Sequence, residues 1–348
     1  MEIKDIALKL LSFRTIAENK EEFTKLFNYI KEICNKELNI KEYEFNGKKS
    51  LVVANTSSVN LDIIFCTHVD IVPIENYKII EDEENIYGRG TIDMKGSVAS
   101  CLYLMNHLHT NKKIGLFITS DEEIDGNCCV ELLKIYNSKF AIVPDGGSNF
   151  DLIVEEKGAL QLKVIAKGIS AHASQPFNGS NAIAKIINLY NKLLEKYPLP
   201  KDSSEYKTTI NLSKIKGGTQ INCVPDYAEA YFDIRHISTD STESIIKCVA
   251  EFEDIDYEIL LDGKVFKTDL NNVLIKKYIS ACETVLNKKI KYSGCESTSD
   301  AIYFYEKGIP TIIMNPIGYY PHNPKEYVNK NSLITLYKIY DKFIDNFK

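Results

Sequence analysis

Four polar segments of this sequence each follow a short apolar run. His68-Val69-Asp70 follows the run at 63–66, Glu122-Glu123 follows 114–118, Asp145 follows 140–143, and His322 lies in the loop after 310–314. Apolar runs of this length are typical of buried strands in an α/β sheet. Ligands bind outside the carboxyl ends of such strands, so the sequence predicts that these histidines and carboxylates meet at one sheet edge.

Imidazoles and carboxylates gathered in a crevice repel and desolvate one another unless a cation neutralises them. Nitrogen and oxygen ligands without cysteine favour Zn²⁺, Mn²⁺ or Co²⁺ over a structural thiolate site or an all-oxygen calcium site. In an extended His68-Val69-Asp70 segment, both polar side chains point to the same face. Asp70 is therefore expected to hold the second ring nitrogen of His68 and fix its tautomer.

Glu122 and Glu123 are adjacent acids that suit divided roles. One carboxylate would bind a metal, while its neighbour would take a proton from a metal-bound water whose pKa is lowered towards ~7. The alternative for adjacent acids is a solvated turn, but a position directly after a buried strand argues against it. A lone His68 or His322 would more often be structural, so the prediction depends on the whole set.

The elements that position these residues follow from hydrophobic spacing. Apolar residues recur with helical spacing over 3–10 and 23–30, the second set opened by Asn19 and Glu22 in capping-box positions. Strand runs at 51–54, 63–66, 114–118 and 140–143 alternate with helical patterns at 94–109 and 127–136, which predicts an α/β fold with a mostly parallel sheet.

After residue 156 the pattern changes to strands of period two, at 160–166 and 228–234, with helices near 181–197 and 242–252. This order predicts an inserted α+β, ferredoxin-like domain over 156–265. Residues 1–155 and 266–348 then form one discontinuous metal-binding catalytic domain, with a helix at 271–286 and a buried run at 310–314.

Composition excludes several classes of protein. The chain has 348 residues, 42 Lys plus Arg and 48 Asp plus Glu, so its net charge of −6 offers no basic surface for nucleic acid. No apolar run approaches the ~20 residues needed to cross a membrane. The acidic start and the absence of an h-region predict a cytoplasmic protein, and the nine cysteines, an odd number without a CxxC pair, are expected to be reduced.

Five motifs, in order, closely resemble the M20 family of dinuclear zinc peptidases and amidohydrolases. They are His68-Val-Asp70, Gly88-Arg-Gly-Thr-Ile-Asp-Met-Lys-Gly96, Ser120-Asp-Glu-Glu123, Pro144-Asp145 and His322-Asn-Pro-Lys-Glu-Tyr-Val328. The resemblance covers essentially the whole chain. It implies two divalent metal ions, zinc first, with cobalt or manganese as alternatives. His68 and Asp145 would bind one ion, Glu123 and His322 the other, and Asp93 would bridge them, with Glu122 as general base.

The same resemblance gives the insertion a role as a lid and dimerisation domain. His172, in Gly168-Ile-Ser-Ala-His172, would reach a partner subunit's site and stabilise the oxyanion. Asn222 and Arg235 match positions that hold the polar groups or carboxylate of the substrate. Ser297 and Thr298 lie in a loop that resembles the family's substrate-carboxylate loop.

The substrate stays open at this point. Asp145 is typical of the peptidase T and carnosinase-like branches, whereas the compact length and the segment at 322–328 resemble the acetylornithine and succinyl-diaminopimelate deacylases. We expect a hydrolase of N-acyl amino acids, with a di- or tripeptidase as the alternative. A non-catalytic metal or amino-acid binding protein on the same scaffold is a second alternative, against which the presence of Glu122 argues.

Overall fold

The computed structural model describes residues 1–202 and 204–347. Clustering of contacts divides the chain into two compact units. Unit 1 comprises 1–154, 268–295 and 299–348, and unit 2 comprises 155–267 and 296–298. The loop at 296–298, which contains Ser297 and Thr298, therefore belongs to unit 2, although the sequence placed it in the catalytic domain.

Unit 1 is built on a nine-stranded sheet of order β1-β2-β6-β3-β7-β15-β8-β13, with β14 paired to β8. Its central strands β6, β3, β7 and β15 are mutually parallel, and β1 and β2 are antiparallel additions at one side. The predicted parallel core is thus confirmed. The strands are β1 (Asn39–Phe45), β2 (Lys48–Ala54), β3 (Asn60–His68), β6 (Ile114–Thr119), β7 (Asn137–Val143), β8 (Leu152–Glu156), β13 (Phe266–Lys267), β14 (Tyr292–Cys295) and β15 (Thr311–Ile313).

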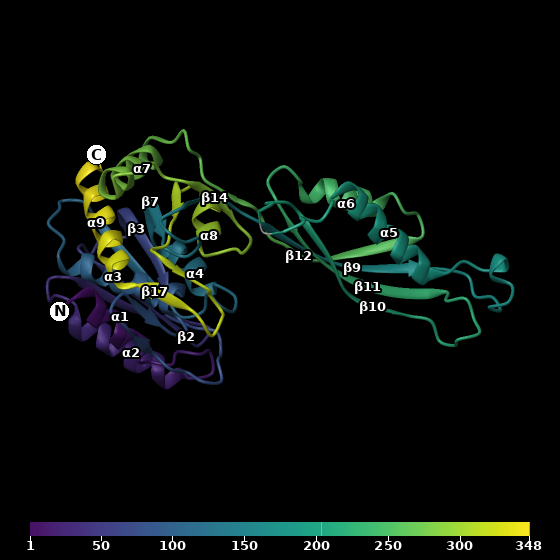
Figure 1. Ribbon diagram of the computed structural model, residues 1–348, viewed down its shortest axis with the longest axis horizontal. Coiled ribbons are helices and arrows are strands. Elements are labelled where there is room, and N and C mark those ends of the chain that lie inside the picture. Colours follow the sequence, from purple (N-terminus) through teal and green to yellow (C-terminus); the bar gives the residue numbers. More distant parts are fainter. Residues whose placement is uncertain (203, 348) are drawn as a thin grey trace. The chain divides into compact units, whose positions relative to one another are not determined.

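Helices cover both faces of this sheet (Figure 1). Alternate residues of β3 show the two layers, because Phe65 packs against Tyr340 of α9 while Cys66 contacts Cys129 of α4. The first layer contains α1 (Ile3–Leu11), α2 (Lys20–Ile33), α3 (Gly96–Asn106), α7 (Val273–Leu286) and α9 (Lys330–Asn346). The second contains α4 (Asn127–Ile135) and α8 (Ala301–Glu306).

The start of α2 corrects one local prediction. Asn19 is the N-cap residue, but its side chain makes no capping hydrogen bond. The carboxylate of Glu22 instead accepts a hydrogen bond from the backbone N–H of Arg14, at 3.2 Å. A contact with a residue before the helix therefore replaces the capping box, which only tertiary structure could reveal.

A small antiparallel sheet of order β16-β17-β5-β4 adjoins the main one in unit 1. Its strands are β4 (Ile80–Glu81), β5 (Asn85–Tyr87), β16 (Gly318–Tyr319) and β17 (Tyr327–Asn329). The β16–β17 connection contains His322, and β5 leads towards the kinked segment Thr91–Lys95, in which Asp93 has non-helical backbone angles. This sheet therefore joins two site-bearing segments that are far apart in sequence.

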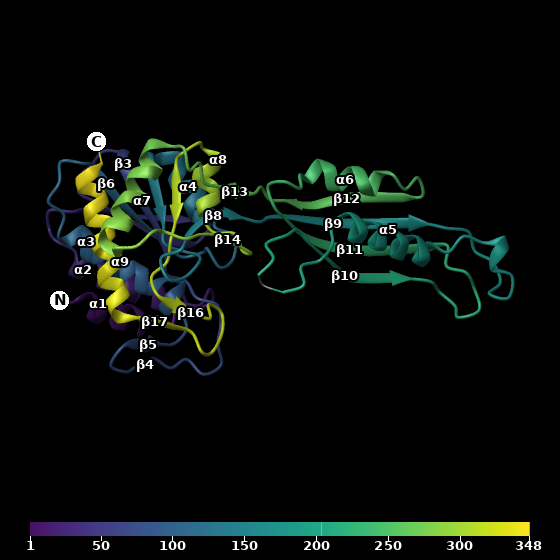
Figure 2. The same cartoon turned by 45° about the horizontal axis from the view of Figure 1, so that its top comes forward.

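Unit 2 has a four-stranded antiparallel sheet of order β10-β11-β9-β12, with α5 and α6 on one face (Figure 1, Figure 2). Its elements are β9 (Gly158–Lys167), α5 (Ala182–Lys196), β10 (Thr209–Gly217), β11 (Tyr227–His236), α6 (Thr242–Ala250) and β12 (Ile255–Asp262), with a 3₁₀ turn at Pro176–Asn178. The β-α-β-β-α-β order is ferredoxin-like, as predicted. Buried alternate residues of β9 and β11, such as Leu162 and Phe232, form its core.

No helix within 1–202 and 204–347 is long and apolar enough to cross a membrane.

Candidate metal centre

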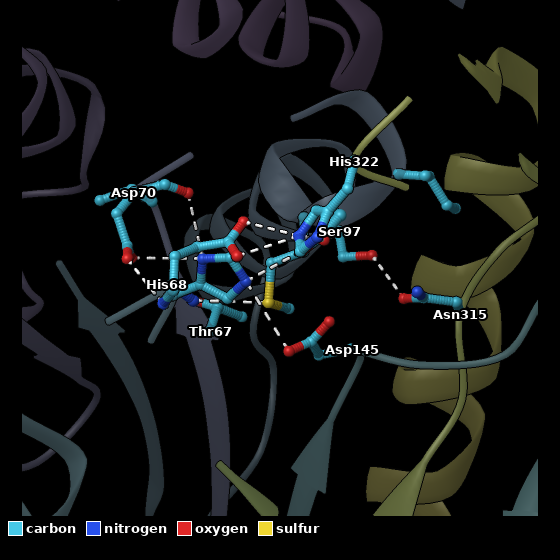
Figure 3. A network of polar contacts seen from close by, with 12 residues as sticks. Thr67, His68, Asp70, Ser97, Asp145, Asn315 and His322 are labelled. Carbon is cyan, nitrogen blue, oxygen red and sulfur yellow. Dashed lines mark hydrogen bonds and ion pairs between the residues drawn. The ribbon is translucent and has the colours of Figure 1, made fainter. Parts of the chain in front are cut away.

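The carboxyl ends of three adjacent parallel strands provide most of the site. His68 is the last residue of β3, Glu122 and Glu123 lie in the turn after β6, and Asp145 follows β7. Asp93 precedes α3, and the peptide bond between Asp93 and Met94 is cis. Figure 3 shows His68, Asp145 and His322 converging at this edge.

Asp93 lies between the two histidines. Its Oδ1 is 3.1 Å from Nε2 of His68, and its Oδ2 is 3.0 Å from Nε2 of His322. Asp145 Oδ2 lies 3.7 Å from the same nitrogen of His68, and Glu123 Oε2 lies 2.9 Å from that of His322. The side chains thus form two three-residue groups that share Asp93: His68, Asp93 and Asp145, and Asp93, Glu123 and His322.

Asp70 contacts the other side of the His68 ring. Nδ1 of His68 is 3.3 Å from Asp70 Oδ1 and 3.2 Å from the Asp70 carbonyl oxygen. Because both oxygens are acceptors, they hold a proton on Nδ1, so Nε2, which faces Asp93, is the nitrogen that would bind a metal ion once its own proton is displaced. The second oxygen of Asp70 accepts the backbone N–H of Glu123 at 2.9 Å, so one buried carboxylate orients residues of both groups.

Glu326 and Arg89 position Asp93, a role that the sequence did not suggest. Glu326 Oε1 accepts the backbone N–H groups of Ile92 at 3.1 Å and Asp93 at 3.3 Å. Its Oε2 accepts a 2.8 Å hydrogen bond from Arg89, and both side chains are buried. Each residue lies within a quoted motif, but the pair is 237 positions apart in sequence, and no local pattern links them.

The pKa shifts in the cluster show that its carboxylates favour positive charge beside them. Burial acts to raise the pKa of Asp93, but hydrogen bonds from His322 and His68 outweigh it and hold this pKa below its usual value. Hydrogen bonds to Asp93 and Glu123 raise the pKa of His322 to about 10. Burial and the neighbouring Asp93 raise the pKa of Asp145 to about 7. Protons therefore balance the negative charge of this cluster, as bound metal ions would.

Metal affinity is consequently expected to rise steeply with pH. Burial acts to lower the pKa of His68, but hydrogen bonds to Asp70 and Asp93 raise it well above 6.5. Both imidazoles thus carry protons at neutral pH, and metal must displace them. Since each ion would displace the proton of one imidazole, we expect the apparent affinity for each ion to increase about 10-fold per pH unit from about pH 6 to pH 8. Calorimetric titration of the metal-free protein with Zn²⁺, in buffers of different ionisation enthalpy, measures the released protons; a pH-independent affinity would contradict the prediction.

Glu122 differs from the other acids of the cluster. No hydrogen bond or ion pair holds its side chain among residues 1–202 and 204–347. Burial, and next the charge of Asp145, raise the pKa of its carboxyl well above 4.5, and His68 opposes this shift. It is therefore a carboxyl near His68 and Asp145 that has a raised pKa and is free to exchange a proton.

Unit 2 contains the remaining predicted residues, at two opposite ends of its sheet. His172 and Asn222 lie beyond the paired ends of β9 and β11, where Ala173 N–H donates to Asn222 O at 2.9 Å. Arg235 lies near the other end of β11, paired with Ala159, and makes a bidentate contact with Asp233 at 2.8 and 3.3 Å. Thr298 is at that end too, since its hydroxyl donates to the Lys157 carbonyl at 3.1 Å.

The donor set fits divalent metal ions. The two groups contain imidazole nitrogens and carboxylate oxygens only, which suit Zn²⁺, Co²⁺ or Mn²⁺. In each group the ligand atoms lie within 4.8 Å of one another, as neighbours around one ion do. A carboxylate with one oxygen near each histidine is the arrangement that a bridging ligand requires.

Comparison with known proteins agrees with this geometry. The model of "Peptidase family M20/M25/M40" matches residues 64–346, a range that includes every residue of the cluster. The chain belongs to this family. The M20 resemblance inferred from the motifs is thereby confirmed, and the chain is a hydrolase of amide or peptide bonds that uses divalent metal ions. This favours an enzyme over the binding-protein alternative.

Relatives of this M20 hydrolase include deacylases. It is 29% identical over 296 residues to a [LysW]-lysine/[LysW]-ornithine hydrolase of Saccharolobus solfataricus, covering 83% of this chain and 78% of the relative. It is 29% identical over 330 residues to a succinyl-diaminopimelate desuccinylase of Sulfurimonas denitrificans, covering 88% and 89%. A solved tripeptidase of Staphylococcus aureus has a similar fold, with a TM-score of 0.79 at 21% identity, covering 99% and 97%.

Proposed function

We propose that this M20 hydrolase is a two-metal enzyme that cleaves the amide bond of N-acyl amino acids. The observation that supports it most strongly is the position of Asp93, with one oxygen near His68 and the other near His322. In this proposal His68 and Asp145 hold one ion, Glu123 and His322 hold the other, and Asp93 bridges them. The ions are zinc first, with cobalt or manganese as alternatives.

Bound divalent ions would supply an activated water and polarise the scissile carbonyl. The protein would contribute proton transfer and orientation. Glu122 would accept a proton from the attacking water and give it to the leaving amine, and its raised pKa suits a group that must hold a proton between the two steps. Asp70 would keep the Nε2 lone pair of His68 directed at the ion.

The deacylase assignment draws on sequence similarity. The hydrolase and desuccinylase relatives match this chain over more than three quarters of their length. A di- or tripeptidase is the second candidate, favoured by Asp145 and by a fold similar to that of the tripeptidase. An N-acyl amino acid and a dipeptide both have an amino-acid carboxylate beside the cleaved amide, which a guanidinium such as Arg235 can bind in bidentate fashion.

A substrate panel tests this proposal. The metal-loaded enzyme is assayed with N-acetylornithine, N-succinyl-diaminopimelate, and simple di- and tripeptides, with release of the free amine as the readout. We expect the highest kcat/KM with an N-acyl amino acid. Preference for a tripeptide would favour the peptidase candidate. Asp145 would then indicate the substrate class better than the segment at 322–328 does.

The layout of unit 2 supports a site shared between two subunits. Arg235 is eight residues along β11 from Tyr227, a separation of about 27 Å at the usual strand rise, and His172 lies beyond the Tyr227 end. The two side chains of one chain are therefore too far apart to touch one small substrate. We propose a homodimer through unit 2, in which His172 and Asn222 act on the partner's substrate.

His172 has the tautomer that an oxyanion donor needs. Its Nδ1 accepts the backbone N–H of Ser174 at 3.2 Å, which leaves the ring proton on the exposed Nε2. His172→Ala is expected to lower kcat about 10²- to 10³-fold, the usual effect of losing one such donor.

Subunit complementation tests the sharing. When His172→Ala and Glu122→Gln chains are co-expressed, mixed dimers contain one site with both groups intact, so about a quarter of wild-type activity should return. Tagged chains purified in tandem provide the mixed dimer for assay. A mixed dimer as inactive as its parents, or a fully active monomer in light scattering, would contradict a shared site.

A further inference from the structure

A second cluster of metal-ligand side chains lies inside unit 1, separate from the residues assigned above. It consists of Cys66 of β3, Cys129 of α4 and Asp300, which directly precedes α8. Both cysteines are fully buried, and Asp300 is 3% exposed. The cluster shares no residue with the two groups around Asp93, and it joins one strand to the two helices that cover that face of the sheet.

The distances within the cluster suit a tetrahedral ion. The sulfur atoms of Cys66 and Cys129 are 3.7 Å apart, and Cys66 Sγ is 3.7 Å from Asp300 Oδ2. With metal–sulfur bonds of about 2.3 Å and metal–oxygen bonds of about 2.1 Å, tetrahedral angles place two sulfurs about 3.8 Å apart and a sulfur and an oxygen about 3.6 Å apart. The three side chains therefore need little movement to bind one ion.

The charges in and around the cluster also favour a bound cation. Among residues 1–202 and 204–347, Asp300 has no ion pair, and its Oδ2 accepts a hydrogen bond from the thiol of Cys66. Burial, and next Cys66, raise the pKa of its carboxyl well above 3.8. Asp121 lies near Cys129 and Asp300; its Oδ2 pairs with Lys48 at 3.8 Å, while its buried Oδ1 has no hydrogen-bond partner in the described part of the chain. Buried anionic groups are usually paired or bound to a metal.

We propose that Cys66, Cys129 and Asp300 bind a third, structural metal ion of the thiophilic divalent class, such as Zn²⁺. Two thiolates neutralise a divalent ion, and the Asp300 oxygen provides the third ligand. Such an ion ties β3, which ends at His68, to α4, which begins after the turn that contains Glu122 and Glu123. It therefore stabilises the strand and turn on which the catalytic residues lie, without contact with substrate.

Cobalt substitution tests this site apart from the catalytic one. The whole protein is freed of metal, reduced, and titrated with Co²⁺ without oxygen. The candidate catalytic ligands contain no sulfur, so only a cysteine site gives thiolate-to-cobalt charge-transfer absorption in the near ultraviolet. We expect this absorption to saturate at one cobalt ion per chain, whatever the occupancy of the sites around Asp93.

Variants assign the absorption to residues. Cys129→Ser is expected to abolish it and Asp300→Asn to weaken cobalt binding at this site, while Cys128→Ser, a neighbouring buried cysteine outside the cluster, is expected to leave it unchanged. Should Cys129→Ser fail to fold, Asp300→Asn still tests the site. Absence of the band from the wild-type protein, its persistence in Cys129→Ser, or a Cys66–Cys129 disulfide in the purified protein would overturn the proposal.

Discussion

Replacing Glu122 by glutamine is expected to lower kcat about 10²- to 10⁴-fold, the usual contribution of a general acid–base group, while the metal content stays unchanged. The amide keeps the size of the side chain but cannot accept and return a proton. Since no described residue holds the Glu122 side chain, its replacement should leave the cluster around Asp93 intact. Steady-state kinetics and metal analysis of the same preparation measure both effects.

Glu123→Gln is the matched comparison. The carboxylate of Glu123 lies 2.9 Å from His322 Nε2, so the Glu123→Gln variant should lose metal as well as activity. Two adjacent glutamates would thus give two distinct results from the same chemical change. Full hydrolytic activity in metal-loaded Glu122→Gln would show that another group acts as the base.

Asp93→Ala is expected to weaken binding of both metal ions by more than about 100-fold, beyond the 10- to 100-fold typical of losing a residue that only orients a ligand. The reason is that Asp93 has one oxygen near each histidine, so a single substitution would remove a proposed ligand from both ions. Metal content after dialysis against a weak chelator measures the loss.

Asp62→Asn provides the control for Asp93→Ala. Asp62 lies near the start of β3, at the opposite end of the strand from His68, where it pairs with Lys139 at 2.8 Å. We expect this variant to retain both ions and activity. If Asp93→Ala also kept two tightly bound ions, the bridging role would be wrong.

Hydrophobic spacing was sufficient to predict the layout of this fold. The runs at 63–66 and 114–118 lie within β3 and β6, so the residues after them meet at one sheet edge. The period-two residues of β9 and β11 likewise predicted the second sheet. These predictions succeeded because burial on one face or both is a local property of a strand.

Contacts between distant segments could not be predicted in the same way. The hydrogen bonds that Glu326 accepts from the Asp93 segment, the replacement of the Asn19 capping box, and the place of 296–298 in unit 2 all depend on where the chain returns after long connections. The Cys66, Cys129 and Asp300 cluster is another such case, because its members come from three separate elements. Residue type predicted candidate ligands, but only the tertiary structure shows which of them are neighbours.

Anomalous diffraction from crystals of the metal-loaded enzyme, collected at the zinc edge, tests the two-metal claim most directly. We predict two peaks about 3.5–4 Å apart, the usual spacing of such pairs, with Asp93 bound to both. His68 and Asp145 should bind one ion, and Glu123 and His322 the other. A single peak at this edge of the sheet, or two ions that Asp93 does not bridge, would contradict the proposed centre.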